Sequence, residues 1–399
     1  MNAYIIDGIR TPIGNFGGTL STVRADDLAA MVIKELMNRN SEVPAGAIAD
    51  VIMGCVNQAG DDNRNVARMA LLLAGLPYTV PGETVNRLCA SGMSAVVNAA
   101  RAIANNDGDL FIAGGVEHMT RGPYVISKSS KPFGTDAQLF DSSFGWRFIN
   151  PQMEKMYGVD AMGVTAENLA ELYNISRADQ DAFAYNSQQK ASKATERLAK
   201  EIMPVTIAAK KGEPVVFAAD EFIKPATTVE GLSKLKPAFK KENGTVTAGN
   251  ASGLNDGAAA ILMASEAAIK KYNLQAKAKI ISSAVVGVEP RIMGIGPVDA
   301  TKQALAKAGL TLNDIDIIEL NEAFAAQSIA CIRALGLKDD DARINVNGGA
   351  IALGHPLGMS GARIIYSAAL ELQQQYKKYA LATMCIGVGQ GYAVVLERV

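Results

Sequence analysis

The stretch that decides the fold is Ser91-Gly-Met-Ser-Ala-Val-Val-Asn-Ala-Ala-Arg-Ala-Ile-Ala104, which reads as a helix with few charges around its circumference. Such a helix is usually buried, and its small Ala, Gly and Ser side chains let a neighbouring element approach closely. A similar helix is expected over Ser360–Leu370, and the tripeptide Gly92-Met93-Ser94 recurs there as Gly358-Met359-Ser360. Two buried helices between two sheets predict an α/β fold built as a five-layer αβαβα sandwich.

The elements around these two helices follow the same order. An apolar strand is expected before each helix, at Val51–Val56 and at Ile315–Leu320. Another strand, which ends in glycine, is expected after each helix, at Leu110–Gly115 and at Leu381–Gly387. The matched order predicts that the sandwich consists of two duplicated halves.

The chain divides into three parts. Strands and helices alternate over residues 1–120, where Ala3–Ile9 suits a buried strand and Asp26–Met37 suits a helix with one apolar face. Residues 121–245 contain loop-like stretches such as Ser127–Gly134, and a helix start marked by Ser176–Asp179. We therefore expect an N-terminal half over 1–120 that is completed by 246–273, an inserted loop domain over 121–245, and a C-terminal half over 274–399.

Composition and charge exclude several classes of protein. The 399 residues are 49% hydrophobic, 20% charged and 6% aromatic, which is a globular rather than a disordered composition. With 39 basic and 40 acidic side chains, the net charge of −1 gives no general attraction to nucleic acid or to anionic lipid. No apolar run approaches the roughly 18 residues of a membrane span, and the first residues lack a signal-peptide pattern. We expect a cytoplasmic protein without nucleic-acid or membrane partners.

The four cysteines are expected to be free thiols in a reducing compartment. Cys89 lies where a short strand meets a buried helix, and the positive end of a helix dipole favours a thiolate there. The alternative is a small buried hydrophobic residue, which is the preferred interpretation for Cys55 and Cys331. No metal site is expected, because the two histidines, His118 and His355, lack ligand-spaced neighbours.

Two further residues are candidates for chemistry. His355 stands in a glycine-rich turn before a helix and is a candidate base, whereas His118 follows a strand end and is expected to be structural. Cys385 ends an apolar strand and runs into glycines at 387, 389 and 391. The chain continues there as a strand, so these glycines do not form a dinucleotide-binding loop. They are better suited to present backbone N–H groups to a developing oxyanion.

Four segments that carry these residues, in this order, resemble the thiolases, which exchange acyl groups between coenzyme A thioesters. The similarity covers essentially the whole chain, and two more segments fit the same family. The six segments are Asn86–Met93, Asn321–Gln327, Asn345–Gly358, Cys385–Gly391, Asp7–Pro12 and Ala248–Gly257. Within the family, the likeness is closest to the 3-oxoadipyl-CoA thiolases of aromatic-compound catabolism. That likeness rests on Gln58–Pro77, Gly145–Pro151 and Pro290–Pro297.

Thioester exchange explains why such an enzyme uses cysteine. Passing an acyl group from coenzyme A to a cysteine replaces one thioester by another, whereas a serine would form a more stable oxygen ester. The resemblance implies that Cys89 carries the acyl group, that His355 activates it, and that Cys385 protonates the leaving acetyl-CoA enolate. It also implies one oxyanion site from His355 and a water held by Asn321, and another from the N–H groups of Cys89 and Gly387. Asn321 could instead cap a helix over Glu322–Arg333.

The resemblance also implies where substrate binds. Ser252 and Ala248 would lie along the pantetheine path, and Lys224 would stand near the nucleotide. Three residues would lie near the acyl end: Met162, Met293 and Phe324. The short-chain acetoacetyl-CoA thiolases have a histidine where this chain has Ala161. A distal carboxylate on the substrate favours a nearby cation, for which the candidates are Arg147, Arg64 and Arg68, each of which could equally be a solvated or interface arginine.

The sequence therefore predicts an acyltransferase that cleaves a 3-oxoacyl-CoA, with 3-oxoadipyl-CoA preferred, by ping-pong transfer through Cys89 to give acetyl-CoA and succinyl-CoA. Coenzyme A is expected as a substrate, with no tightly bound cofactor and no metal. The alternatives are an acetyl-CoA C-acetyltransferase, a general 3-ketoacyl-CoA thiolase, a ketosynthase, and an acyl-CoA or lipid binding protein without turnover. The family suggests a homodimer or homotetramer, with residues 121–150 as a tetramer contact.

Overall fold

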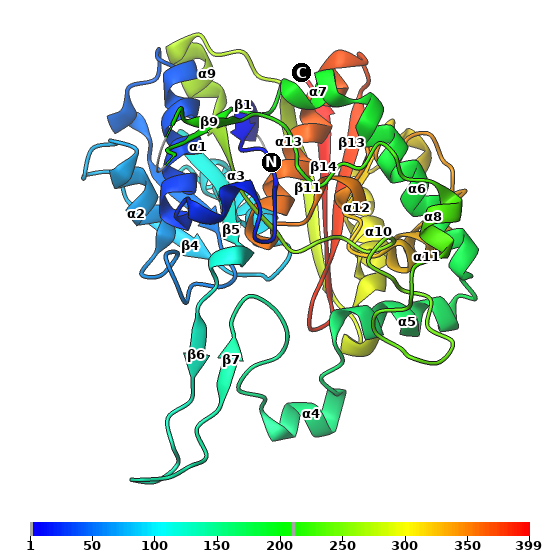
Figure 1. Ribbon diagram of the computed structural model, residues 1–399. Helices are drawn as coiled ribbons and strands as arrows, with labels where there is room; N and C mark the ends of the chain where they lie inside the picture. The colour runs from blue at the N-terminus through cyan, green and yellow to red at the C-terminus, as the bar shows by residue number, and fades with distance from the viewer. Residues whose placement is uncertain (1–2, 210–211) are drawn as a thin grey trace.

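The structure is a computed structural model that describes residues 3–209 and 212–399 (Figure 1). Its main sheet has ten strands, and nine of them follow the order β12-β13-β14-β11-β1-β10-β5-β3-β4. In chain order these nine strands are β1 (Ala3–Arg10), β3 (Asp50–Gly54), β4 (Gly82–Val85), β5 (Leu110–His118), β10 (Asn255–Ala264), β11 (Ala278–Gly287), β12 (Ile317–Leu320), β13 (Tyr379–Ile386) and β14 (Gln390–Arg398). The tenth, β2 (Gly14–Asn15), pairs with β10.

The two halves of this sheet have the same topology, which confirms the predicted duplication. In the N-terminal half β3 pairs parallel with β5, β5 pairs antiparallel with β10, and β10 pairs antiparallel with β1. In the C-terminal half β12, β13, β14 and β11 repeat the same three pairings in the same order. One feature was not predicted: β1 also pairs with β11 over Ala3–Ile5, so the two halves form one continuous sheet.

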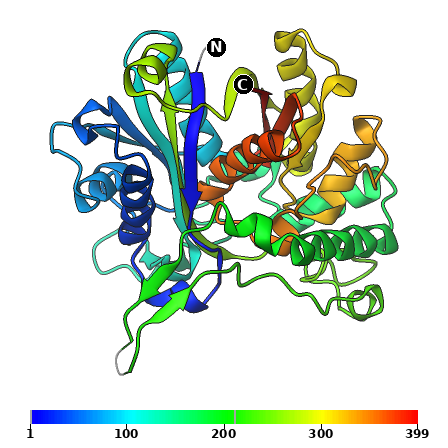
Figure 2. The ribbon, with the colours of Figure 1, turned by 90° about the horizontal axis from the view of Figure 1, so that it is seen from above.

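Helices cover this sheet in layers, as the sequence predicts. The buried helices α3 (Ser91–Ala104) and α13 (Leu357–Gln374) pack against each other between the two halves (Figures 1 and 2). The outer face of the N-terminal half packs on α1 (Ala25–Arg39) and α2 (Val66–Leu73). The outer face of the C-terminal half packs on α10 (Gly296–Ala308) and α11 (Ala325–Ala334).

Glycines set the distance between the two central helices. A Cβ atom on Gly92 of α3 would lie 2.5 Å from the carbonyl oxygen of Gly358, and one on Gly361 of α13 would lie 2.3 Å from the backbone nitrogen of Met93. Both distances are far below van der Waals contact, so the backbones approach as closely as the small residues predict. Helix α13 begins at Leu357, three residues before the predicted start, because Pro356 is its N-cap residue.

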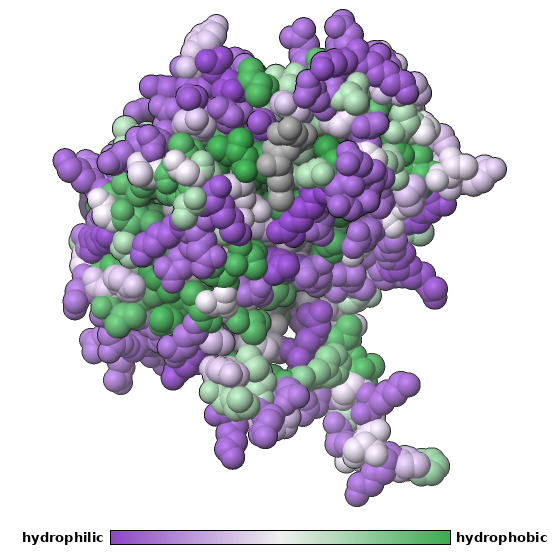
Figure 3. Space-filling view, turned by 180° about the vertical axis from the view of Figure 1, so that it is seen from behind, coloured by the Kyte–Doolittle hydropathy of each residue, from purple (hydrophilic) through white to green (hydrophobic). Residues whose placement is uncertain are grey.

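The region between β5 and β10 contains short elements. The hairpin of β6 (Tyr124–Ile126) and β7 (Leu139–Asp141) extends away from the body as an arm (Figures 1 and 3). Helix α6 (Arg177–Lys193) begins with the predicted capping box of Ser176 and Asp179. The other elements of this region are α4 (Pro151–Tyr157), α5 (Met162–Leu172), α7 (Thr195–Ala199), β8 (Val205–Ile207), β9 (Val215–Phe217) and α8 (Val229–Ser233). We retain residues 121–245 as a proposed inserted domain.

The remaining helices are short. They are α9 (Glu266–Tyr272), α12 (Ala350–Leu353) and five 3-10 turns at Thr19–Thr22, Ala45–Ala47, Met119–Arg121, Pro290–Ile295 and Leu312–Asp314. In the described part of the chain, no helix combines the length and the apolar character needed to cross a bilayer.

Candidate active site

Cys89 lies in a tight loop between β4 and α3. The preceding residue, Leu88, has a φ of 46°, a left-handed conformation that is strained for a bulky side chain. Ser91 at the start of α3 stabilises this loop, because its hydroxyl donates to the Leu88 carbonyl at 2.7 Å and accepts from the Arg87 N–H at 2.9 Å. The strained turn therefore presents the half-buried Cys89 thiol at the N-terminal end of α3.

The surroundings of Cys89 raise the pKa of its thiol. Burial is the main cause, and the N–H groups of Gly387 and of Cys89 itself act in the opposite direction by hydrogen bonding to the sulfur. The negative charge of Glu117 raises the pKa further. The helix N-terminus therefore does not produce a thiolate by itself, and Cys89 needs a base to remove its proton.

His355 occupies the equivalent place in the C-terminal half. Cys89 and His355 each stand two residues before the first residue of a central helix, α3 and α13 respectively. The turn at His355 follows Gly354, whose φ is 104°, and it is held by Asn255, whose side-chain oxygen accepts from the His355 N–H at 3.0 Å. The two duplicated halves thus present a cysteine and a histidine at matching positions.

Hydrogen bonds define which nitrogen of His355 carries its proton. Its Nδ1 lies 2.6 Å from the hydroxyl of Ser360, and that hydroxyl donates its single hydrogen to the Pro356 carbonyl at 2.9 Å. Ser360 must then accept from Nδ1–H, so Nε2 is the unprotonated nitrogen. Burial and the positive charge of Arg363 lower the pKa of His355 to about 3, which keeps the imidazole neutral at ordinary pH.

Asn321 lies beside this imidazole. Its side-chain Nδ2 is 3.5 Å from His355 Nε2, and its backbone N–H donates to Thr383 on β13 at 3.0 Å. Its Oδ1 has no hydrogen-bond partner among the described residues, although the side chain is fully buried. Helix α11 begins only at Ala325 with Phe324 as its N-cap residue, so the alternative that Asn321 caps this helix is wrong.

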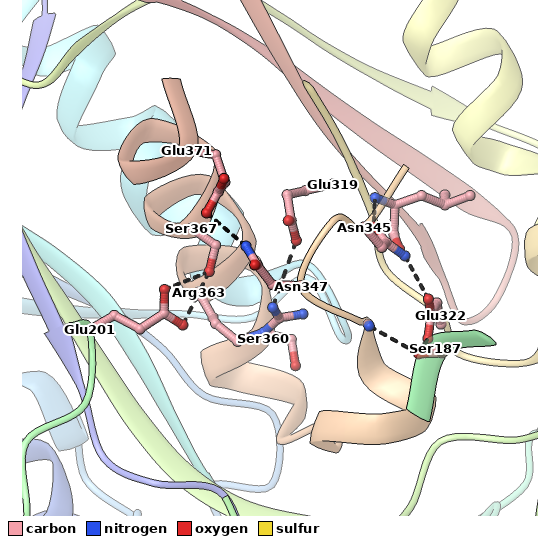
Figure 4. Close-up of polar contacts among 12 residues, drawn as sticks. Ser187, Glu201, Glu319, Glu322, Asn345, Asn347, Ser360, Arg363, Ser367 and Glu371 are labelled. Atoms are coloured by element: carbon pink, nitrogen blue, oxygen red, sulfur yellow. Dashed lines mark hydrogen bonds and ion pairs between the residues drawn. The ribbon is translucent and has the colours of Figure 1, made fainter. Parts of the chain in front are cut away.

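Glu322 holds the Asn321 loop in place. Its carboxylate is buried and accepts hydrogen bonds from Ser187 at 2.6 Å, from Asn345 at 2.7 Å and from the Ile351 N–H at 3.2 Å (Figure 4). Asn345 also bonds both backbone groups of Leu320 at 2.8 Å. The loop that carries Asn321 is therefore held by Ser187 of α6, by Asn345 and by the backbone of α12 (Ala350–Leu353).

Cys385 reaches the same region from β13. Burial raises the pKa of its thiol well above the usual value, and the nearby Cys89 raises it further. Cys385 therefore remains a protonated thiol, the form that a proton donor needs. It belongs to one apolar cluster with Met293 and Phe324, which brings three predicted site residues together.

The remaining predicted substrate residues occupy different surroundings. The sulfur of Met162 lies 3.7 Å from where a Cβ on Gly387 would stand. The Ser252 N–H donates to Ala323 at 3.0 Å, beside Phe324. Ala248 is exposed four residues before Ser252, and Lys224 is an exposed residue whose ammonium lies 4.8 Å from the ring of Phe222.

The three candidate arginines also differ in their contacts. Arg68 donates to the carbonyls of Tyr78 and Val80, which gives it a structural role. Arg64 is exposed. Arg147 is half-buried and donates to the Ser142 carbonyl at 2.9 Å, while the neighbouring Trp146 donates to the carbonyl of Asp160 at 3.2 Å, two residues before Met162.

Several contacts of the site were missed from the sequence. The sequence did not predict that Ser360 and Asn255 hold His355. Ser360 belongs to the repeated tripeptide Gly358-Met359-Ser360, and Asn255 belongs to the segment at 248–257. His118, for which a structural role is predicted, is buried, with Nδ1 3.3 Å from Asp256 and Nε2 3.1 Å from the Leu20 carbonyl. Cys55 and Cys331 are fully buried in the core, as expected.

The chain is similar to known proteins over its full length. Residues 3–267 match the family described as thiolase, N-terminal domain, and residues 274–398 match thiolase, C-terminal domain. The chain is 59% identical to a beta-ketoadipyl-CoA thiolase of Acinetobacter baylyi, with 100% of both chains covered. It is 57% identical to the 3-oxoadipyl-CoA/3-oxo-5,6-dehydrosuberyl-CoA thiolase of Escherichia coli, covering 100% of this chain and 99% of that one. The crystal structure of the Bacillus anthracis acetyl-CoA acetyltransferase is similar with a TM-score of 0.92 and 40% identity, covering 100% and 99%.

The fold and both matched domains define an acyltransferase. More specifically, the chain belongs to the thiolase family, as its sequence segments predict. Thiolases exchange acyl groups between coenzyme A thioesters, so coenzyme A enters this enzyme as a substrate rather than as a tightly bound cofactor.

Proposed function

We propose that this thiolase cleaves 3-oxoadipyl-CoA with coenzyme A to give acetyl-CoA and succinyl-CoA, through an acyl-enzyme on Cys89. The observation that carries the proposal is the hydrogen-bonding of His355, which leaves Nε2 unprotonated beside Asn321. An unprotonated Nε2 can remove the proton that the raised pKa of Cys89 otherwise retains.

The first half-reaction breaks a carbon–carbon bond. His355 Nε2 takes the proton of Cys89, and the sulfur attacks the 3-keto carbon of the substrate. The bond between C2 and C3 then breaks, the succinyl group stays on Cys89 as a thioester, and the acetyl-CoA enolate takes a proton on C2 from Cys385. His355 with Asn321, and the N–H groups of Cys89 and Gly387, would stabilise the negative oxygens, each donor contributing about 3 kcal/mol.

The second half-reaction restores the enzyme. The Cys385 thiolate takes the proton of an incoming coenzyme A thiol, and the resulting thiolate attacks the acyl-enzyme carbonyl. Cys89 leaves and recovers its proton from His355, so that every group returns to its starting state. The raised pKa values of Cys89 and Cys385 support this scheme, because each thiol holds its proton in the resting enzyme and has recovered it by the end of the second half-reaction.

The preference for a dicarboxylic substrate rests on the relatives and on Arg147. Both the Acinetobacter and the Escherichia relatives are named for 3-oxoadipyl or beta-ketoadipyl substrates. Among the three candidate arginines, Arg147 lies in the segment that leads to the Met162 wall of the proposed acyl pocket. A second candidate activity is acetoacetyl-CoA turnover, which the 40% identity to an acetyl-CoA acetyltransferase favours.

The family and the surface support a proposal for the assembly and the location. We propose that coenzyme A passes Ser252 and Ala248, with Lys224 near its nucleotide. The exposed apolar side chains of the arm formed by residues 121–150 suit a contact in a homotetramer, and a homodimer is the alternative assembly. These side chains include Tyr124, Ile126, Phe133 and Leu139. A cytoplasmic location is proposed, without nucleic-acid or membrane partners.

A coupled assay for coenzyme A-dependent loss of 3-oxoadipyl-CoA, run beside acetoacetyl-CoA, tests the proposal. We expect a higher kcat/KM for 3-oxoadipyl-CoA, and no turnover or acyl-enzyme in Cys89→Ser. A preference for acetoacetyl-CoA would establish the second candidate instead. A labelled acetyl group trapped on Cys89→Ser at the wild-type rate would refute the role of Cys89.

A further inference from the structure

Helix α13 carries a buried polar stripe along one face. Ser360, Arg363, Ser367 and Glu371 are spaced three or four residues apart, so they lie in a row along the helix (Figure 4). All four are buried between the two halves of the sheet. Burying charged side chains costs free energy even when they are paired, so this row needs an explanation other than stability.

The stripe begins at the candidate active site. Ser360 holds Nδ1 of His355, and Arg363 follows one helical turn later. The Arg363 Nη1 lies 3.7 Å from an oxygen of Glu319, and both side chains are only 2% exposed. Burial raises the pKa of Glu319 to about 8 although the charge of Arg363 acts in the opposite direction, so the pair is fully ionised only above that pH. Glu319 belongs to β12 and stands two residues before Asn321, so the ion pair joins the helix that holds His355 to the strand that leads to Asn321 (Figure 4).

These contacts close a ring. His355 contacts Ser360, one turn of α13 leads to Arg363, Arg363 pairs with Glu319, β12 leads to Asn321, and Asn321 returns to His355 at 3.5 Å. The Arg363–Glu319 pair is the long-range tie in this ring. Its removal would leave the Asn321 loop held by Glu322 and Asn345 but without this contact to the helix that holds His355.

Other charged groups surround this pair. Ser367 donates to Glu201 at 3.0 Å, and Glu201 in turn pairs with Arg10 at 2.7 Å and with Arg197 at 2.9 Å. The ionisable groups around the pair and the His355 helix include Asp7, Arg10, Glu117, Arg197, Glu201, Asp220 and Glu371. Arg10 and Arg197 pair with Glu201, whereas Arg363 pairs with Glu319 of β12.

We propose that Arg363 and Glu319 are positioning residues, whose buried ion pair fixes the His355 imidazole and the Asn321 side chain relative to each other at one oxyanion site. This inference rests on the proposed function, in which those two groups stabilise an oxyanion. The fixed charge of Arg363 has a second effect, because it disfavours a positive imidazole and so keeps His355 unprotonated in the resting enzyme.

Three variants test the pair. Arg363→Met removes the charge and keeps much of the length, and we expect kcat to fall about 10- to 100-fold because a misplaced catalytic group costs about that much. The KM for coenzyme A should stay within about twofold, and Arg363→Lys should recover part of the loss. Glu319→Gln should also lower kcat. If Arg363→Met does not fold, the kcat of Glu319→Gln tests whether the pair positions the active site.

A spectroscopic readout separates positioning from general damage. The sequence has only two histidines, so protein labelled at histidine Cε1 shows two imidazole signals by NMR, and His355→Asn assigns them. Arg363→Met should let His355 ionise at higher pH than in the wild type, because the neighbouring positive charge is gone. Glu319→Gln leaves that charge in place, so it should not raise the pH at which His355 ionises.

Arg197→Met is the matched control. Arg197 is a largely buried arginine of the same network, with its side chain 10% exposed, and it pairs with Glu201 and Glu371 rather than with β12. We expect a lower Tm, a kcat within about twofold of the wild type, and an unchanged His355 signal. Equal losses of kcat in Arg197→Met and Arg363→Met would overturn the proposal, as would a kcat within twofold of the wild type in both Arg363→Met and Glu319→Gln.

Separate measurements test this inference and the proposed function. Wild-type enzyme without activity on either 3-oxoadipyl-CoA or acetoacetyl-CoA would refute the proposed function. The His355 signal needs no turnover, so an imidazole unaffected by Arg363→Met would refute the positioning role even in an enzyme that has the proposed activity.

Discussion

Replacing Gly361 by alanine should separate the two central helices and, with them, Cys89 and His355. A Cβ at this position would lie 2.3 Å from the Met93 nitrogen, whereas ordinary contact begins at 3.4 Å, so the backbones must move apart by 3.4 − 2.3 = 1.1 Å. Overpacking of this kind costs about 1–3 kcal/mol. A displacement of about 1 Å at a reacting centre costs about 10²-fold in rate.

The assay is the thiolysis rate of folded enzyme together with the Tm from calorimetry. We expect Gly361→Ala to lower the Tm and to reduce kcat about 10²-fold, and Gly92→Ala, which acts from the other helix, to do the same. Gly309→Ala is the control, because Gly309 has a φ of 68° with open space around it at the end of α10. The left-handed conformation costs an alanine about 1–2 kcal/mol there, so the Tm should fall without loss of activity. A Gly361→Ala enzyme within twofold of the wild-type kcat would refute the coupling between helix spacing and chemistry.

Three more predictions concern single side chains. Arg147→Ala should lower kcat/KM for 3-oxoadipyl-CoA about 10- to 100-fold but leave acetoacetyl-CoA nearly unchanged, and equal losses on both substrates would exclude a carboxylate contact. Cys385→Ala should keep alkylation of Cys89 by iodoacetamide but lower thiolysis about 10²- to 10⁴-fold, and normal turnover would remove Cys385 from the mechanism. The pKa of His355 is about 3 in the folded chain, compared with 6.5 in the unfolded chain. Between these two pH values the unfolded chain binds a proton at His355 that the folded chain does not bind. The free energy of unfolding is therefore highest above pH 6.5 and decreases as the pH falls toward 3. His355→Asn should therefore flatten the fall in Tm over that range in calorimetry, and an unchanged slope would contradict the low pKa.

Local signals in the sequence predicted most of the architecture. The small-residue composition of Ser91–Ala104 predicts a close helix pair, and Gly92 and Gly361 provide it. Because capping involves residues that are neighbours in the chain, Ser176 and Asp179 also predict the start of α6 correctly. The continuous pairing of β1 with β11 was not predictable, because it joins segments from different halves of the chain and depends on how those halves dock.

The residues of the candidate site also divide into those that local sequence predicts and those that depend on distant contacts. Residue type and glycine context singled out Cys89, His355 and Cys385. Their supporting contacts come from distant parts of the chain, such as Asn255, which is 100 residues from His355. The start of the helix after Asn321 was predicted too early, because the loop from Asn321 to Phe324 is held by tertiary bonds from Glu322 that no local pattern reports.

Peptide mass spectrometry of enzyme quenched during exposure to 3-oxoadipyl-CoA without coenzyme A bears most directly on the account. A succinyl group is predicted on the peptide that contains Cys89, at close to one per active chain, and its release should follow addition of coenzyme A. The same group found on the Cys385 peptide, or no covalent acyl group at all in an enzyme that turns over, would contradict it.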